Sequence, residues 1–303
     1  MIVREATLDD TQDIVAVHLT SPDRPFERPL ESLTIAQRND YGGPWMSVES
    51  CAIHLNNLLA WGHAPLVVEE GGRVIAETEF YIGPDIPPLG TALDISVLYV
   101  HADFQRRGAG SMLMEAMIAR ARQAGCAYMT VSGGVGSPEF YGRFGFSHLL
   151  DLPVIDCDLA AMTGPCACEP YVPGDFQALP GGTLWIGRFL SPRQKWRQIV
   201  DEIQKRDPIL PEHAGRPRPA GRIWRTDRCL GFLVPEWGNP AKADLYCWSE
   251  TLTGQVVSEL LAQAHLAGYA QACLLCHPRV VDVVGQACGC GPSRSWAMWG
   301  KKL

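Results

Sequence analysis

The chain has 303 residues, of which 47% are hydrophobic and 19% are charged, and its formal net charge at neutral pH is -7. This composition predicts a packed globular protein of one large or two ordinary domains and excludes bulk disorder. The negative charge argues against nucleic acid or an acidic membrane as a partner. No apolar run is long enough to span a bilayer, and the first residues lack the layout of a signal peptide, so we expect a cytoplasmic protein with no membrane partner.

In chain order, the first half alternates strands and helices. We expect a strand at 2–6, a helix that follows Thr7, an irregular stretch at 21–64 with a helix at 48–61, a hairpin of 65–69 and 74–82, a strand at 91–100, a helix at 110–123, a strand at 126–131, a short helix at 137–143 and a strand at 144–152. The hairpin prediction rests on two apolar runs around Gly71 and Gly72, and the helix at 110–123 on its apolar face.

The second half repeats this order of elements without a clear repeat of residues. We expect strands at 184–190, 222–226, 230–235, 243–249, 272–276 and 295–299, and helices at 191–205, 254–266 and 280–287. Ser191 and Pro192 are typical of a helix start, with serine as the N-cap and proline at the first helical position. A linker at 156–180 separates the two halves in this interpretation.

A strand, a glycine-containing loop and a long helix follow one another around residues 97–123. The amides at a helix start have no partner within the helix and, with the helix dipole, can bind a phosphate or pyrophosphate. Gly108 and Gly110 allow the backbone to approach such a ligand closely, and Arg106 and Arg107 add positive charge. The loop lacks the Lys-Ser/Thr pair of a P-loop and the three-glycine spacing of a dinucleotide fold.

Two motifs resemble the GNAT superfamily of N-acyltransferases. The run from Gln105 to Gly110 matches the family's Gln/Arg-x-x-Gly-x-Gly/Ala signature, and Tyr141 stands four residues before the pair Gly145-Phe146, as in the family's C-terminal motif. The resemblance covers residues 1 to about 155. It implies a mixed α/β fold, with a mostly antiparallel twisted sheet flanked by helices, and acetyl-CoA as the co-substrate.

The resemblance also implies the cofactor-binding residues. The pantetheine arm would lie along the backbone of the fourth strand, and the pyrophosphate would bind the amides of the signature loop and helix start. The residues implied are Leu98, Tyr99, Val100, Gln105, Arg106, Arg107, Gly108, Ala109, Gly110 and Ser111.

The same resemblance assigns Tyr141 as the acid that protonates the leaving thiolate. The base is open. Asp94 is the first candidate, since alternation along the fourth strand would place Asp94, Ser96 and Leu98 on one face. Glu77 and Glu79 share a face of the preceding strand, and Glu79 is the second candidate. Ser96 and Val97 stand where the family often has a glutamate, which favours a water relay.

The element order of residues 181–303 is also similar to a GNAT fold, but the corresponding loop, from Ser249 to Gln255, has one glycine and no arginine. We therefore expect residues 1–155 to form the domain with the acetyl-CoA site. Residues 181–303 would form a second, degenerate GNAT-like domain without the pyrophosphate loop, and a homodimer is possible.

Three functions compete. The first is N-acetyl transfer to an amine of a small molecule or peptide, by direct transfer in a ternary complex. The second is a non-catalytic acyl-CoA-binding sensor or interaction protein. The third is a cysteine-based metal or redox protein, prompted by eleven cysteines and the run from Cys273 to His277. Zinc needs about four ligands and haem attachment needs export, so we expect free thiols and no metal.

Overall fold

The computed structural model describes residues 1–131, 137–160, 162, 169–171, 181–204, 222–236 and 239–303. The predicted linker at 156–180 lies largely outside these residues. Among the described helices, none combines the length and the apolar character needed to cross a bilayer.

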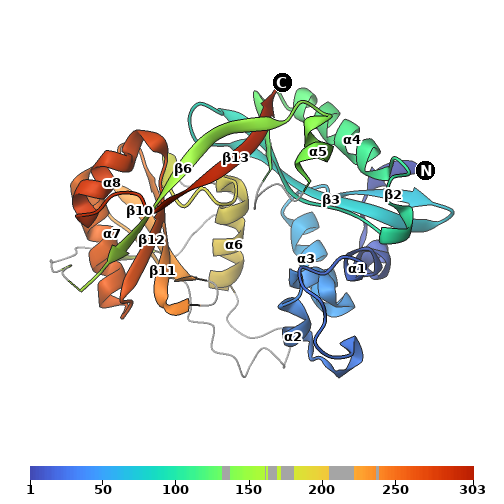
Figure 1. The fold of residues 1–303 in the computed structure, drawn as a ribbon, viewed down its shortest axis with the longest axis horizontal. Coiled ribbons are helices and arrows are strands. Elements are labelled where there is room, and N and C mark those ends of the chain that lie inside the picture. The colour runs from blue at the N-terminus through green and yellow to red at the C-terminus, as the bar shows by residue number, and fades with distance from the viewer. Residues whose placement is uncertain (132–136, 161, 163–168, 172–180, 205–221, 237–238) are drawn as a thin grey trace.

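The fold is a mixed α/β structure in which one mostly antiparallel sheet of 13 strands runs through both halves (Figure 1). The strands of the first half are β1 (Ile2–Glu5), β2 (Leu66–Glu70), β3 (Arg73–Pro84), β4 (Thr91–Val100), β5 (Tyr128–Val131) and β6 (Ser147–Asp158). Those of the second half are β7 (Glu169–Pro170), β8 (Thr183–Ile186), β9 (Arg222–Arg225), β10 (Cys229–Glu236), β11 (Asn239–Ser249), β12 (Gln271–Leu275) and β13 (Arg294–Lys302).

Helices cover the faces of this sheet. The first half contains α1 (Thr11–Leu19), α2 (Ile35–Asn39), α3 (Val48–Ala60), α4 (Ala109–Gln123) and α5 (Pro138–Gly142). The second half contains α6 (Pro192–Gln204), α7 (Gly254–Leu266) and α8 (Val281–Cys288). Leu113, Met114 and Met117 of α4 are buried against β3, β4 and β5, as the apolar face of its sequence predicts.

The two halves exchange strands at their junction. The strand order β4-β5-β13-β6-β12-β11 places β13, from the end of the chain, between β5 and β6 of the first half. β6 in turn pairs with β12 of the second half. Figure 1 shows β6 and β13 running side by side from one half to the other. The two halves therefore share one hydrogen-bonded sheet.

Candidate active site

The parallel strands β4 and β5 pair along the first part of β4. They pair from Ala92 opposite Tyr128 to Ile95 opposite Val131, and β4 then continues to Val100. On the β5 side, no described strand pairs with residues 96–100 of β4, whereas β3 covers the other edge. We call the point after Ile95 and Val131 the β4–β5 fork. Beyond it, the described residues leave one edge of β4 with backbone groups that another extended chain can pair with.

A bulge lies at the fork. Glu79 is opposite Val97 and Phe80 is opposite Ile95, so Ser96 is an extra residue in β4. The expectation that Asp94, Ser96 and Leu98 share a face is therefore wrong for Leu98. Leu98 packs into the same apolar cluster as Ile95, on the opposite face of β4 from Asp94, because the bulge shifts the alternation by one residue.

The signature loop leads from β4 into α4 with two residues in the left-handed backbone region. Arg106 has φ 61° and Gly108 has φ 97°. Within the described part of the chain, the backbone amides of residues 106–111 donate no hydrogen bond, whereas the amide of Met112 donates to the Gly108 carbonyl. Six consecutive donors are therefore available to an anionic ligand, beside the positive end of the α4 dipole.

Gly110 has a steric role at the start of α4. A Cβ at this position would lie 3.3 Å from the Phe140 ring and 3.5 Å from the Val100 side chain. The helix start therefore packs closely against the end of β4 and against α5. This contact fixes the loop relative to the free edge of β4.

Tyr141 lies in α5, buried against Phe140 and Phe146, with ring centroids 5.2 and 5.6 Å away. Burial and the nearby Tyr99 phenol raise the pKa of Tyr141 to about 12. The Tyr141 phenol is therefore neutral at physiological pH and can donate a proton.

Two carboxylates of β3 point to the face of the sheet that α1 and α3 cover. Glu77 contacts His18 of α1, and both oxygens of Glu79 lie 2.9 and 3.0 Å from Nε2 of His54 in α3. Trp45 Nε1 also donates to Glu79, at 2.8 Å. Burial by itself would raise the pKa of Glu79, but His54 and Trp45 hold it below its usual value.

The two histidine–glutamate pairs differ in exposure. The side chains of His18 and Glu77 are each 1% exposed, whereas those of His54 and Glu79 are 17% and 4% exposed. Among these four groups only His54 has substantial contact with solvent. The sequence reasoning missed His54, because it lies 25 residues before Glu79 inside a segment whose packing no local pattern reveals.

Asp94 belongs to a different cluster. Its Oδ1 accepts from Thr130 Oγ1 at 2.5 Å and lies 3.3 Å from Nη2 of Arg188, which comes from the second half. All three side chains are buried. The carboxylate of Asp94 is therefore held in a buried network. This placement favours a structural role for Asp94 over the role of base.

The comparisons with known proteins agree with this geometry. Residues 30–146 match the model of the acetyltransferase (GNAT) family. We refer to these matched residues as the GNAT domain. Both motifs that carried the resemblance lie in this GNAT domain, and so do the fork, the signature loop and Tyr141.

Two solved structures are similar to nearly the whole chain. A GCN5-related N-acetyltransferase from Kribbella flavida has a TM-score of 0.60 at 14% identity, over 99% of this chain and 71% of that chain. Eis1 from Mycobacterium abscessus has a TM-score of 0.57 at 12% identity, over 100% of this chain and 74% of that chain. At these identities the likeness concerns the fold, and it extends beyond the GNAT domain into the second half.

The second half differs at the position that corresponds to the fork. β11 and β12 pair in parallel only from Lys242 opposite Gln271 to Asp244 opposite Cys273. Beyond that point, β8 pairs with β11 at Cys247 to Ser249. The amide of Gly187, just after β8, donates to the Leu275 carbonyl of β12. A strand of the chain itself therefore fills the gap that stays unpaired in the described part of the GNAT domain.

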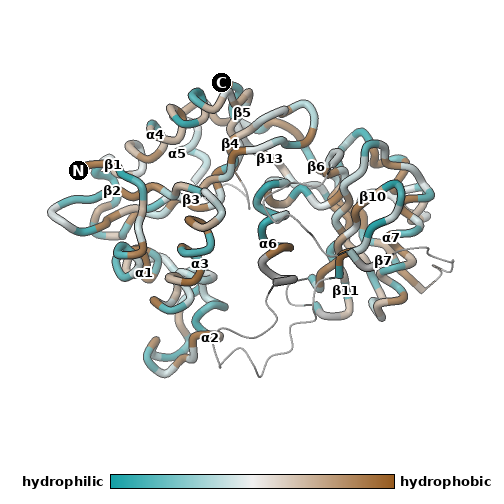
Figure 2. Tube along the Cα trace, turned by 180° about the vertical axis from the view of Figure 1, so that it is seen from behind, coloured by the Kyte–Doolittle hydropathy of each residue, from teal (hydrophilic) through white to brown (hydrophobic). Residues whose placement is uncertain are grey.

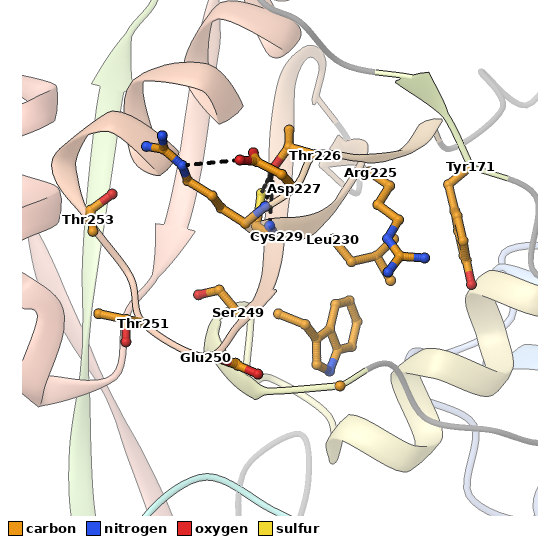
Figure 3. A pocket seen from close by; sticks show the side chains of 13 residues that line it. Tyr171, Arg225, Thr226, Asp227, Cys229, Leu230, Ser249, Glu250, Thr251 and Thr253 are labelled. Carbon is orange, nitrogen blue, oxygen red and sulfur yellow. Dashed lines mark hydrogen bonds and ion pairs between the residues drawn. The ribbon is translucent and has the colours of Figure 1, made fainter.

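An open cavity of about 720 Å³ lies in the second half, between the β9–β10 hairpin and the start of α7 (Figure 3). Arg225 and Arg228 line it together with Asp227 and Glu250, so both signs of charge are present. Arg228 contacts Gln255 and lies 3.6 Å from Asp227. The cavity is remote from the fork and does not gather the groups of the candidate site.

The cysteine motif of the second half is packed into the fold. Cys276 is buried in the apolar core, and the His277 ring lies 2.7 Å from the Pro87 carbonyl oxygen. Cys273 lies instead near Glu236 and Asp244. Two cations already flank that group. Lys242 Nζ is 3.1 Å from Glu236, and Arg294 Nη2 is 3.8 Å from the Cys273 sulfur, so the group is a poor site for a metal ion.

Proposed function

We propose that this chain is an N-acetyltransferase that moves an acetyl group from acetyl-CoA to an amine of a small molecule or peptide, by direct transfer in a ternary complex. One observation carries the proposal. The free edge of β4 beyond the fork and the six amides of residues 106–111 adjoin one another. The first suits an amide-rich pantetheine arm and the second suits a pyrophosphate.

Tyr141 is the proposed acid. Its raised pKa keeps the phenol protonated, which a donor to a departing thiolate requires. Tyr99, near the end of β4, contributes to that shift.

The proposed base is His54, oriented by Glu79. An acceptor amine must lose a proton to attack, and the partly exposed imidazole of His54 is suited to take it, directly or through water. The carboxylate of Glu79 fixes the orientation of the ring through its contacts with Nε2. Glu79 therefore keeps a place in the mechanism as the group that positions His54.

The second half is proposed as a GNAT-like domain without cofactor. β8 occupies the gap between β11 and β12, and the loop before α7 has one glycine, both of which support this view. The domain limits 1–155 and 181–303, the homodimer and the cytoplasmic location stay predictions.

The function is tested with purified full-length protein, acetyl-CoA and a panel of amines that covers amino sugars, polyamines, amino acids and peptide N-termini. Release of free thiol that depends on the amine is the expected result, with coenzyme A binding measured in parallel by calorimetry. Binding without turnover across the panel would favour the alternative of an acyl-CoA-binding sensor. Absence of coenzyme A binding would overturn both.

A further inference from the structure

A buried arginine of the second half reaches into the GNAT domain. Arg188 follows β8, and its Nε and Nη2 donate to the two oxygens of Asp85 at 2.7 and 2.6 Å. Nη2 also lies 3.3 Å from Asp94 Oδ1 and 3.2 Å from Thr130 Oγ1. Burial opposes ionisation, but the two carboxylates raise the pKa of Arg188, so the guanidinium stays charged.

The position of these contacts along the strands is informative. Asp94 of β4 and Thr130 of β5 are register partners, next to the last described pair, Ile95 and Val131. Arg188 contacts both side chains, and Thr130 bonds to Asp94 directly. The last paired segment of the fork is therefore tied together by a residue from outside the GNAT domain.

A second contact holds the bulge. Gln194, in the first turn of α6, donates from Nε2 to Ser96 Oγ at 2.6 Å. Ser96 is the extra residue of β4, directly beyond the fork. Gln194 is buried, and the amide of Gln194 lies 3.4 Å from Ser191 Oγ at the helix start, so α6 fixes the direction of its side chain. Figures 1 and 2 both place α6 between the two halves.

Gly187 makes this approach possible. Its φ is 97°, and a Cβ there would lie 2.2 Å from the Tyr246 ring. Only glycine turns the chain from β8 toward the GNAT domain at this point without a clash. The turn at Gly187 therefore places the Arg188 side chain beside Asp85 and Asp94.

We propose that the second half is a part of the acetyl-CoA site: Arg188 and Gln194 are positioning residues that hold the paired ends of β4 and β5 together and fix how the bulge at Ser96 presents its backbone. The inference rests on the proposed function. A bulge without side-chain partners can adopt several local conformations. A bulge that is held in one conformation lowers the entropic cost of ordering the strand edge when ligand binds.

The test is a double-mutant cycle on Gln194 and Ser96. Gln194→Met keeps the size of the side chain and removes the donor, and Ser96→Ala removes the acceptor. We expect each variant to weaken coenzyme A binding or lower kcat about 3- to 10-fold, the value of one such hydrogen bond. The double variant should lose no more than either single variant, because the two residues act through one contact.

The control is Gln255→Met, which removes an exposed side-chain amide from α7 and should leave affinity and kcat unchanged. If both single variants lower the melting temperature but bind and turn over like wild type, the contact is only structural and the inference falls. Additive losses in the double variant overturn it as well. If wild type binds no coenzyme A, the proposed function falls and this inference falls with it. If wild type binds coenzyme A and the single variants match it, only this inference falls.

Discussion

Two histidine–glutamate pairs lie on one face of β3. We assign a catalytic role to His54 with Glu79 and a structural role to His18 with Glu77. We expect His54→Ala to lower kcat about 10²- to 10⁴-fold, as loss of a general base does, and free imidazole to restore part of the rate. His18→Gln alters the fully buried pair of His18 and Glu77, and it should mainly lower the melting temperature. Rates with an amine acceptor, with and without imidazole, check both. Equal rate losses in the two variants, without rescue of His54→Ala, would contradict the assignment.

Tyr141 gives a prediction about pH. Its pKa of about 12 means that the phenol keeps its proton up to roughly pH 11. The rate should therefore rise with pH as the acceptor amine loses its proton, and then stay level to about pH 10. Tyr141→Phe should lower kcat at every pH in this range and leave coenzyme A affinity within about twofold. A falling limb at about pH 8 to 9 that disappears in Tyr141→Phe would show that the phenol titrates there.

Asp94 tests whether a buried carboxylate near the fork is a base or part of the network around Arg188. Asp94→Asn keeps the shape and an acceptor oxygen for Thr130, but it removes one negative charge beside Arg188. We expect the free energy of unfolding to fall by about 1–3 kcal/mol and kcat to fall less than 10-fold. Denaturant unfolding and steady-state rates measure the two effects. A rate loss above 100-fold with unchanged stability would restore Asp94 as the base.

At the scale of elements, helix α4 offers a comparison between its two ends. Gly108 at its start and Gly125 just beyond its end both have positive φ, 97° and 67°, and a Cβ on either would meet nothing within 4 Å. Alanine at either position should therefore cost a similar backbone strain, about 1–2 kcal/mol of stability. Only Gly108→Ala should also weaken coenzyme A binding, because it changes the direction of the loop amides. Calorimetry and thermal unfolding of both variants check this, and equal affinities would place the pyrophosphate elsewhere.

Local patterns of the sequence were sufficient for elements that local forces determine. The strand at 91–100 and the helix at 254–266 were predicted with the bounds that the structure has, because each is a continuous run with clear ends. The signature loop could be found for the same reason, since its glycines and the following helix are contiguous. These features need no knowledge of what packs against them.

The features of the site that the sequence did not reveal depend on contacts between distant segments. The bulge at Ser96 is visible only in the register of β4 against β3, and the pairing of His54 with Glu79 only in the packing of α3. Arg188 reaches Asp94 across 94 positions of sequence. No periodicity carries such information, so the sequence makes Asp94 a candidate base but does not reveal the ion-pair network around its side chain.

At the scale of the whole molecule, the two halves have the same order of paired strands. β3, β4, β5 and β6 correspond to β10, β11, β12 and β13, with α4 and α7 in matching crossovers. Each half supplies one strand that completes the other: β13 covers β5, and β6 covers β12. Such an exchange couples the halves more tightly than a linker does, because breaking it would expose strand edges.

This exchange predicts how the chain behaves when it is divided. A fragment of residues 1–160 lacks β13, so it leaves the edge of β5 unpaired, and it lacks the buried Arg188 that neutralises Asp85 and Asp94. We expect this fragment to be insoluble or unfolded by itself. Co-expressed with residues 181–303, it should form a 1:1 complex that binds one coenzyme A, since β8 fills the second gap. Light scattering and calorimetry of the separate and co-expressed fragments measure this. A monomeric 1–160 fragment that binds coenzyme A with the affinity of the full chain would show that the GNAT domain needs no strand or side chain from the second half.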